Sequence, residues 1–519
     1  MSNFLSQVES INSSVNGVVW GIFGLVLLIG TGILVTICTK FFQVSHIGLW
    51  WKSTIGKLFA KNVISHRKDK QISPFQALCT ALAATVGTGN IAGVAAAICV
   101  GGAGAVFWMW VAAFFGMMTN YAENVLGIYF RRKNSEGEWS GGAMYYLQDG
   151  MGGYTCNGKK IFKIPSKILA VLFCLFTMLA SFGIGSMGQV NQIVANVAAA
   201  FDVRALSSIN VFGEISLYNI ILGVLIMILT AVITLGGVKR IANVAEKIVP
   251  FMVVLFVAGS LVIIGVNYQA ILPAFKAIFV NAFAPEAFVG GGLGAVIIAM
   301  TNGFKRGVFS NEAGLGSSVM VHSNSSVKEP VQQGMWGIFE VFADTMVVCT
   351  MTALVVLTSG GLNGGVFNAK TGVIAEGFTD ATLVGGAFNE VFSWGNIVSK
   401  FVAIAMFLFA FTTVLGWSHY GSKAWEYLFG AKTTVVFRII HVITIIFGAV
   451  LTSSLAWDIS DTFNGLMMIP NLIGVLFMIP LVVKITKNYV DRKVRNKDVA
   501  PIISYDPEIQ KEQTANLDD

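Results

Sequence analysis

Apolar residues in this chain fall into eleven runs of roughly 20 residues, separated by polar segments. A helix of that length rises about 1.5 Å per residue and crosses a hydrocarbon core about 30 Å thick. Strands of a membrane barrel would alternate apolar and polar positions over about 10 residues, and the runs do not alternate in this way. The pattern therefore predicts an all-α polytopic membrane protein with eleven transmembrane helices. The expected spans are 18–39, 75–100, 105–130, 168–200, 217–235, 246–267, 288–304, 333–358, 397–417, 434–454 and 463–483.

Composition agrees with a membrane protein. The chain is 55% hydrophobic and 12% charged, whereas a soluble protein is about 25% charged. The segment before Val18 is polar and has no Lys or Arg, so we expect a retained helix and no secretory signal. The six Cys and five His are scattered without a metal-binding or disulfide-framework spacing, which argues against a metalloenzyme.

The basic residues set the expected orientation. Lys and Arg are retained in short cytoplasmic loops, and 30 of the 34 lie on one side if the N-terminus is outside. The sequence thus predicts a multi-pass protein of the inner (plasma) membrane with the N-terminus outside and the C-terminus cytoplasmic. The net charge of +7 follows from this bias and indicates no nucleic-acid partner. The polar tail after Asp498 is expected to be disordered.

Two of the spans contain residues that break helices. The second span carries TVGTGN at 85–90, and the seventh opens with VGGGLG at 289–294. Each Gly costs about 1 kcal/mol in a helix, and unpaired backbone within lipid costs several kcal/mol more. Close helix packing through small residues explains Gly93, Ala97 and Gly101, which are spaced by four. It does not explain the two interruptions, which predict discontinuous helices that line a polar site.

The placement of these interruptions predicts an inverted repeat. Each one lies in the first helix of a five-helix block, and the two blocks begin on opposite sides of the membrane. This layout is typical of secondary transporters. The expected division is 1–74 for an extra helix and cytoplasmic loop, 75–267 for the first repeat, 268–287 for an extracellular amphipathic connector, 288–485 for the second repeat, and 486–519 for the cytoplasmic tail.

The chemistry of a broken helix suits a zwitterion. Amides at a helix N-terminus favour an anion such as a carboxylate. Carbonyls that have lost their helix partners can bind a small hard cation or an ammonium group. An amino acid can therefore place one end at each interruption.

Five stretches resemble the alanine or glycine:cation symporter family, also called the sodium:alanine symporters, which have the LeuT-type fold. The run NEAGLGSS is specific to this family, and the resemblance extends over about residues 15 to 490. The matching stretches are ATVGTGNIAGVAAAI (84–98), SGGAMYYL (140–147), GSMGQVNQIV (185–194), RGVFSNEAGLGSS (306–318) and FTTVLGWSHYG (411–421).

The resemblance implies a substrate site. The amides of Thr88 and Gly89, with Asn90 beside them, would bind the carboxylate, and Gln189 would donate or accept a hydrogen bond. Backbone at the second interruption would contact the amino group, and the pocket wall would come from the ninth span. The implied substrate residues are Thr88, Gly89, Asn90, Gln189, Gly291, Gly292, Leu293, Thr413 and Trp417.

The resemblance also implies one co-transported sodium ion. Its ligands would be the carbonyls of Ala83 and Val86 and the hydroxyls of Thr412 and Thr413. Other roles remain open for these residue types. Thr in a membrane helix often donates to its own i−4 carbonyl. Gln189 could bridge helices, and Trp417 could anchor the protein at the membrane interface.

Two further carboxylates lie within spans, Glu123 in the third and Asp344 in the eighth, four residues after Glu340. Charged groups at such depth are usually paired or functional. We favour structural roles over proton relay for both.

The NEAGLGSS stretch follows the seventh span. Ser310 or Asn311 is expected to cap a short helix that has Glu312 in its first turn. We interpret this stretch as part of an inner gate, outside the substrate site.

The sequence therefore predicts a transporter that imports alanine or glycine with sodium by alternating access. A glutamine-preferring or proton-coupled symporter of the same fold is the alternative. An ion channel fits two inverted halves poorly, because channels repeat a pore element around an axis. The spans show no nucleophile–base pair for an enzyme. The expected partners are the amino acid and the lipid bilayer, without an obligate protein partner.

Overall fold

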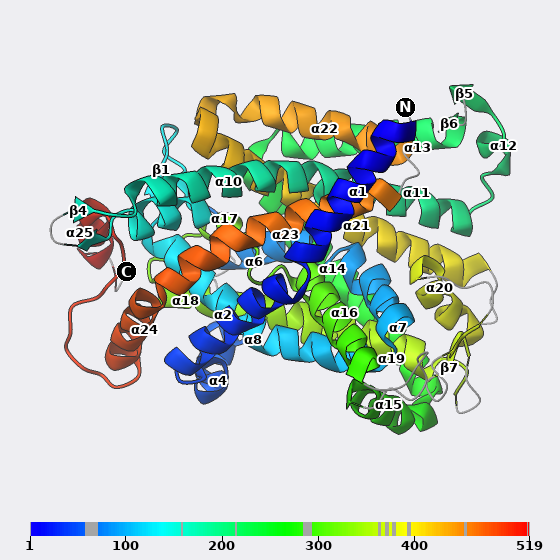
Figure 1. The fold of residues 1–519 in the computed structure, drawn as a ribbon, viewed down its shortest axis with the longest axis horizontal. Helices are drawn as coiled ribbons and strands as arrows, with labels where there is room; N and C mark the ends of the chain where they lie inside the picture. The colour runs from blue at the N-terminus through cyan, green and yellow to red at the C-terminus, as the bar shows by residue number, and fades with distance from the viewer. Residues whose placement is uncertain are drawn as a thin grey trace.

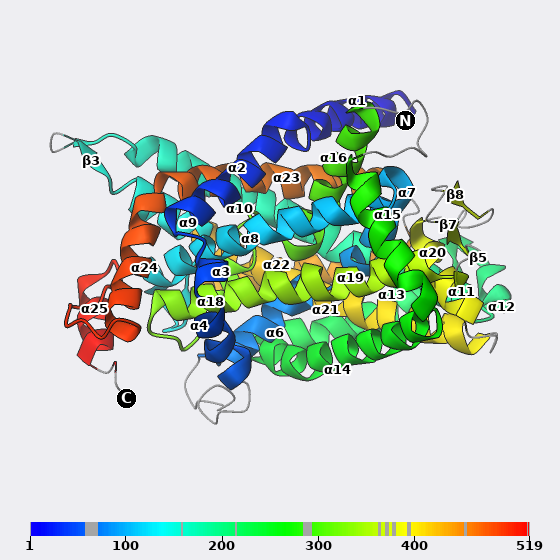
Figure 2. The same ribbon diagram turned by 90° about the horizontal axis from the view of Figure 1, so that it is seen from below.

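The protein forms an elongated bundle of helices (Figures 1 and 2). The computed structural model describes residues 2–57, 71–156, 159–212, 215–283, 293–361, 365–368, 373–375, 380–391, 396–450, 454–515 and 517. The C-terminal segment lies at one end of the long axis in both views, and the N-terminus lies toward the other end.

The N-terminal segment consists of helices on the outside of the bundle. Helix α1 (Ser2–Val19) is followed by α2 (Ile22–Cys38), which packs mainly against α8 (Gly104–Tyr129) and α23 (Ser454–Phe477). The apolar side chains of Ile22, Phe23 and Val26 are exposed, as expected of a surface that faces lipid. The connecting elements are α3 (Phe42–Ser45), α4 (Ile47–Ser53) and η1 (Ile55–Lys57).

The first interrupted span begins at a well-defined cap. Ser73 and Gln76 form a capping box, with Pro74 at the first helical position, so that the first free amides of α6 are satisfied. This half of the chain consists of α6 (Pro74–Thr85), η2 (Gly89–Gly93), α7 (Val94–Gly101), α8 (Gly104–Tyr129), β1 (Arg132–Lys133), β2 (Trp139–Ser140), α9 (Ala143–Tyr145), η3 (Tyr146–Met151), β3 (Thr155–Cys156), β4 (Lys159–Lys160), α10 (Lys163–Phe182), η4 (Gly183–Met187), α11 (Gly188–Ala200), α12 (Arg204–Ser207), β5 (Asn210–Phe212), β6 (Ile215–Ser216), α13 (Leu217–Thr234) and α14 (Gly237–Val266).

The second half of the chain begins with the short connecting helices η5 and α15. Its elements are η5 (Tyr268–Ala270), α15 (Ile271–Phe283), α16 (Leu293–Asn311), α17 (Val319–His322), α18 (Pro330–Val341), η6 (Phe342–Cys349), α19 (Thr350–Thr358), β7 (Phe367–Asn368), β8 (Val373–Ile374), α20 (Asp380–Val391), α21 (Asn396–Phe429), η8 (Ala431–Thr433), α22 (Thr434–Val450), α23 (Ser454–Phe477), α24 (Ile479–Lys493) and α25 (Pro507–Ala515). In the described part of the chain, the strands form four two-stranded antiparallel hairpins.

The membrane spans agree in large part with the expected ones. Among the described residues, eight helices are long and apolar enough to cross a membrane, and two bent pairs raise the number to ten. The bent pairs are Pro74–Thr85 with Gly89–Gly101, and Asp458–Phe477 with Ile479–Lys493. The expected span 288–304 corresponds to α16, which is not among the ten and begins where the description resumes after residue 292. The helical membrane fold is confirmed, and the count of eleven and the division into repeats stay predictions.

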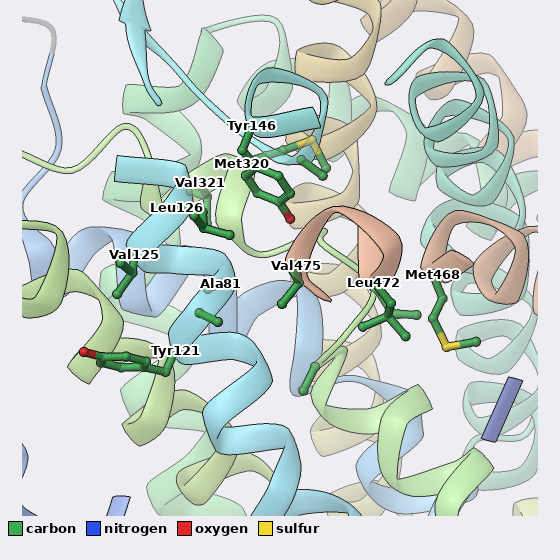
Figure 3. Close-up of a cluster of buried hydrophobic side chains, with 14 of the residues drawn as sticks. Ala81, Tyr121, Val125, Leu126, Tyr146, Met320, Val321, Met468, Leu472 and Val475 are labelled. Carbon is green, nitrogen blue, oxygen red and sulfur yellow. The ribbon is translucent and has the colours of Figure 1, made fainter. Parts of the chain in front are cut away.

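The core at the C-terminal end of the bundle joins both halves of the chain. Figure 3 shows part of it, with Tyr121 and Leu126 from α8, Met320 from α17 and Leu472 from α23. Tyr146 of η3 extends its hydroxyl toward α23, where it donates to Asn471 Oδ1. Packing between elements so far apart in sequence fixes the frame in which the interrupted helices sit.

The C-terminal tail corrects the expectation of disorder. It carries α25 and packs on the end of α8, where Tyr505 N–H donates to the Tyr129 carbonyl at 2.9 Å. Ile503 is fully buried. The side chain of Gln510 accepts from the amides of Ile503 and Ser504 at 2.8 and 2.9 Å. The prediction was wrong because the polar residues of the tail satisfy its own backbone and do not only face water.

Candidate functional site

The first interruption lies between α6 and η2, where the two helical pieces meet at 55°. In a continuous helix the Gly87 amide would donate to the Ala83 carbonyl. Here it donates to the Thr85 carbonyl and to Asn90 Oδ1, each at 2.9 Å. The Ala83 carbonyl thus loses its helix donor, and the amides of Thr88 and Gly89 lie in the first turn of η2, where no intrahelical acceptor is available. The predicted discontinuity in this span is confirmed.

Asn90 braces this interruption against the second half of the chain. Its Nδ2 donates to Asp344 Oδ1 at 2.6 Å, and its carbonyl accepts from Thr352 Oγ1 at 2.8 Å. The Asp344 carboxylate also accepts from Ser310 Oγ and Thr345 Oγ1, both at 2.8 Å. Asn90 was expected beside a substrate carboxylate, and the structure gives it the Asp344 carboxylate as a partner. Asp344 connects η2, the end of α16 and η6.

A second buried interruption separates α16 from α17. Helix α16 continues through Asn311, so the expectation that Ser310 or Asn311 caps a helix beginning there is wrong. The chain then turns through positive φ angles of 56° at Glu312, 93° at Gly314 and 72° at Gly316. A β-carbon on Gly316 would come within 2.7 Å of Asn471, so both φ and space require glycine there.

The two described interruptions face each other. A β-carbon on Gly89 would lie 3.3 Å from Ser310 Cα, so the start of η2 touches the end of α16. The N-terminal amides of η2 carry a partial positive charge, and the C-terminal carbonyls of α16 carry a partial negative charge. The partial positive charge of η2 and the partial negative charge of α16 therefore lie next to each other.

The other predicted interruption falls at the edge of what is described. Gly291 and Gly292 lie outside the described residues, and Leu293 is the first residue of α16. The backbone contacts assigned to these three residues stay a prediction. The interruption after Asn311, which the sequence analysis assigned to an inner gate, is a second candidate for the break that contacts the amino group.

Trp417 lies inside the bundle and contacts this second interruption. Its side chain is fully buried, so an anchor at the membrane interface is excluded. The indole Nε1 donates to Glu312 Oε1 at 2.9 Å, and Ser317 Oγ donates to Glu312 Oε2 at 2.5 Å. The NEAGLGSS stretch therefore contacts Trp417, a residue of the predicted pocket wall. The assignment of this stretch to a gate outside the substrate site stays a prediction, and the structure adds that its Glu312 contacts the predicted pocket-wall residue Trp417.

Two predicted substrate residues present unpaired oxygens. Gln189 donates through Nε2 to the Ile184 carbonyl at 3.1 Å, whereas its buried Oε1 has no hydrogen-bond partner among the described residues. Thr88 Oγ1 is also buried and unpaired within the described part of the chain. A β-carbon on Gly87 would lie 3.6 Å from Gln189 Oε1. Buried polar atoms normally have partners, so these oxygens are candidates to bind a ligand or water.

The predicted sodium ligands also converge in part. A β-carbon on Gly87 would overlap the Thr413 hydroxyl, and one on Gly416 would collide with the backbone of Ala84. Helix α21 therefore packs directly on the end of α6. Thr412 Oγ1 and Thr413 Oγ1 both donate to the Phe409 carbonyl at 3.0 Å. Thr412 Oγ1 also lies 2.9 Å from the Leu408 carbonyl, so both threonines make the i−4 bond expected of membrane Thr, yet both hydroxyl oxygens retain lone pairs for a cation.

Gly185 in η4 provides a direct test of the site's packing. A β-carbon at this position would overlap the Trp417 side chain, so we expect Gly185→Ala to displace the indole from Glu312. Overpacking of this kind costs about 1–3 kcal/mol, and we expect a lower melting temperature together with reduced amino-acid uptake. Gly265→Ala is the matched control, because a β-carbon there meets open space in α14. Melting of detergent-purified protein and uptake into proteoliposomes measure the effects. Equal behaviour of the two variants would contradict this packing.

Carboxylates and amides in the same half of the bundle form a second network. Glu340 accepts from Asn120 Nδ2 at 3.0 Å and pairs with His322 Nε2 at 2.9 Å, and both partners of that pair are fully buried. Glu123 accepts from Asn471, whose amide also donates to the Gly314 carbonyl at 2.8 Å. Asn120 and Asn124 flank Glu123 in sequence but bond to each other at 2.8 Å. These carboxylates support the chain on either side of the second interruption.

Arg131 holds the segment that follows α17. Its guanidinium donates to the carbonyls of Ser323, Ser325 and Val327 at 3.3, 2.7 and 2.5 Å, and it stacks on the Trp139 ring at 4.2 Å. Burial lowers the pKa of Arg131 to about 9, which leaves it charged at neutral pH. Three carbonyl acceptors and an aromatic face compensate the buried charge.

A polar cavity of about 290 Å³ lies along α21 beyond the site, at the end of the bundle rich in Lys and Arg. His419, two residues after Trp417, lines it and is 3.3 Å from Asn324 Nδ2. Lys423 and Glu426 line it further along the helix and form a buried ion pair at 2.9 Å. The lining of the cavity thus begins two residues beyond Trp417 on the same helix.

Comparison with known proteins agrees with this geometry. The sequence model of the sodium:alanine symporter family matches residues 5–502, so the chain belongs to that family. The sodium/alanine symporter AgcS of Methanococcus maripaludis is 42% identical over 94% of this chain and 97% of its own length. The probable sodium/glutamine symporter GlnT of Bacillus subtilis is 34% identical over 95% of this chain and 92% of its own. The crystal structure of MhsT in complex with L-phenylalanine covers 81% of this chain and 99% of that one, with a TM-score of 0.50 and 13% identity, and supports the LeuT-type fold.

Proposed function

We propose that this protein imports alanine or glycine together with sodium by alternating access. Membership of the sodium:alanine symporter family supports the class of transport. The single observation that carries the site is the contact between the start of η2 and the end of α16 inside the bundle. Opposite partial charges there, beside unpaired oxygens of Thr88 and Gln189, suit an amino-acid zwitterion.

Each end of the zwitterion has a proposed place. The carboxylate binds at the amides of Thr88 and Gly89, in the first turn of η2. The amino group faces backbone carbonyls of the second half, either at the end of α16 or at Gly291, Gly292 and Leu293. Trp417, held by Glu312, forms the wall next to Gly185 and limits the size of the side chain that fits.

Sodium binds where α21 packs on the end of α6. The proposed ligands are the carbonyls of Ala83 and Val86 and the hydroxyls of Thr412 and Thr413. The Ala83 carbonyl without its helix donor and the close approach of Thr413 to Gly87 support this assignment. An all-oxygen set suits a hard monovalent cation. Because the ion would join two helices that must separate when the site opens, its binding is coupled to the conformation of the protein.

Release would take place into the polar cavity that begins at His419. The positive-inside assignment places that cavity on the cytoplasmic side of the plasma membrane. One sodium ion that enters down a potential of 100 mV contributes about 2.3 kcal/mol to accumulation.

Uptake into proteoliposomes tests the proposal. We expect labelled alanine and glycine to accumulate when a sodium gradient is imposed and not when only a proton gradient is imposed. Glutamine should enter more slowly, because a pocket discriminates each surplus methylene by about 1–3 kcal/mol. Faster uptake of glutamine would assign the chain to the glutamine-preferring alternative, and uptake driven by protons alone would refute sodium coupling.

A further inference from the structure

A second cavity lies at the Lys- and Arg-rich end of the bundle, away from the transport site. Its volume is about 730 Å³, within the range of roughly 300–1,000 Å³ typical of small-ligand pockets. Its lining residues come from the end of α8, η3, the segment before α10, the bend that joins α23 to α24, and the C-terminal tail. Six aromatic residues line much of its wall. They are Tyr129, Phe130, Tyr154, Phe162, Phe477 and Tyr505.

The aromatic side chains that line the cavity form two packed groups. Phe477 packs on Tyr154 and Phe162 with ring centroids 5.4 and 5.3 Å apart, and Phe130 packs on Tyr505 at 5.2 Å. Tyr154 and Tyr505 are each 50% exposed. A large apolar surface that remains exposed at this level of the bundle is suited to acyl chains or another apolar ligand.

Three exposed lysines lie close in the chain to residues that line the cavity. Lys160 and Lys163 are exposed and flank Ile161 and Phe162, which line the cavity. Lys484 is exposed on α24, one turn after Pro480, which also lines it. None of these three lysines has an ion pair among the described residues.

The acidic groups near the cavity have partners of their own. Asp149, the one carboxylate in the described lining, forms an ion pair with Arg132. Asp506, next to Tyr505, accepts from the amides of Glu508 and Ile509 at 2.9 and 3.3 Å at the start of α25. The three lysines therefore outnumber Asp506, which has hydrogen bonds but no cationic partner among the described residues, beside an apolar interior.

The position of the cavity matches the membrane interface. Helix α24 turns away from α23 by 59°, as a helix does when it leaves the bilayer and runs along its surface. Clusters of Tyr and other aromatic residues are typical of the membrane–water interface. The positive-inside orientation assigns this end to the cytoplasmic leaflet, where anionic lipids attract clustered Lys and Arg.

We infer that this cavity is a binding site for one anionic phospholipid. An acyl chain occupies the aromatic interior, and the phosphate lies at Lys160, Lys163 and Lys484. Three separate observations support this inference: the apolar interior, the exposed lysines beside it, and the interfacial position. The positive charge of the lysines favours an anionic lipid over a zwitterionic one. The bound lipid would connect α10, the α23–α24 bend and the tail.

Native mass spectrometry of the full-length protein with added phosphatidylglycerol or phosphatidylcholine tests the inference. We expect one phosphatidylglycerol to be retained at least fivefold more than phosphatidylcholine. The double variant Lys163→Gln/Lys484→Gln should lose this preference. The matched control Lys52→Gln/Lys276→Gln makes the same charge change at exposed positions outside the cavity and should keep it.

A second variant tests the apolar interior. Tyr505→Gln removes one wall from the half-exposed tail, and we expect it to lower retention of both lipids at least threefold without changing their ratio. Inorganic phosphate at millimolar concentration should not displace the lipid. Equal retention of the two lipids by the wild type, or an undiminished preference in the Lys163/Lys484 variant, would overturn the inference. Neither result would bear on amino-acid uptake, so the two proposals fail separately.

Discussion

Asp344→Asn is expected to reduce alanine uptake at least a hundredfold. The carboxylate accepts from Asn90 at 2.6 Å and from Ser310 and Thr345 at 2.8 Å. An amide offers one acceptor oxygen, so it must turn its NH₂ group toward Asn90 or toward the two hydroxyls. A hydrogen bond to a charged group contributes about 1.5–3 kcal/mol. At least one bond is lost and the others lose their charged acceptor, so a total loss equal to two such bonds corresponds to roughly a hundredfold or more.

We expect the lost hydrogen bonds to reduce transport because Asp344 connects the elements of the proposed substrate site. Its partners are the start of η2 and the end of α16, the two elements whose contact forms the proposed substrate site. Uptake into proteoliposomes that contain equal amounts of folded protein, checked by gel filtration, measures the effect. Uptake within tenfold of the wild type would contradict this role.

Glu123→Gln is the comparison variant for a buried carboxylate. Glu123 Oε1 accepts from Asn471, and its Oε2 has no partner among the described residues. We therefore expect a loss of less than tenfold. Residual uptake in both variants should remain driven by sodium. A switch to proton-driven uptake in either one would favour proton relay over the structural role that the sequence suggested.

The interruption in the second span was predictable because local composition breaks the apolar pattern. Three polar residues and two glycines within 85–90 have no place in a helix that faces lipid. The packing partner of that interruption was not predictable. Asn90 and Asp344 are 254 positions apart, and no local pattern states that their side chains meet at 2.6 Å.

The burial of residues 312–318 was not predictable, for a physical reason. Lys305 and Arg306 precede it, so a hydropathy pattern places residues 312–318 at the membrane boundary. Packing of α16 and α18 against α8 buries this stretch nonetheless. Glu312 becomes a partner of Trp417, which only tertiary structure could reveal.

Local irregularities within long spans were also beyond sequence reasoning. The π-helical turns η4 and η6 interrupt α10–α11 and α18–α19 without a proline. They occur where Gly185 meets Trp417 and where Asp344 meets Asn90. Such turns are frequent at functional sites because one extra residue re-aims the side chains around it.

Thr413→Val is expected to raise the half-saturating sodium concentration at least tenfold. Valine keeps the shape of threonine but removes the hydroxyl that lies against Gly87. The lost interaction with a charged partner corresponds to about 1.5–3 kcal/mol, or roughly tenfold to a hundredfold in affinity. Sodium titrations of alanine uptake measure the shift.

Thr177→Val is a matched control. Thr177 is fully buried in α10, and its hydroxyl donates to the Phe173 carbonyl at 2.7 Å, the same i−4 bond that Thr413 makes with Phe409. It therefore reports the cost of losing that helix bond alone. We expect its sodium dependence to stay within twofold of the wild type. Equal shifts in both variants would remove Thr413 from the sodium site.

Thr413 also borders the proposed substrate pocket, and reciprocity of binding separates the two roles. If sodium and alanine stabilise each other's binding, a variant with weaker sodium affinity shows a raised alanine KM only while sodium is subsaturating. At saturating sodium the KM should return to the wild-type value. A raised KM that persists at every sodium concentration would instead place the hydroxyl on the amino acid. The sodium site would then have to be completed by the carbonyls of α6 and Thr412, because Thr413 would be occupied by the substrate.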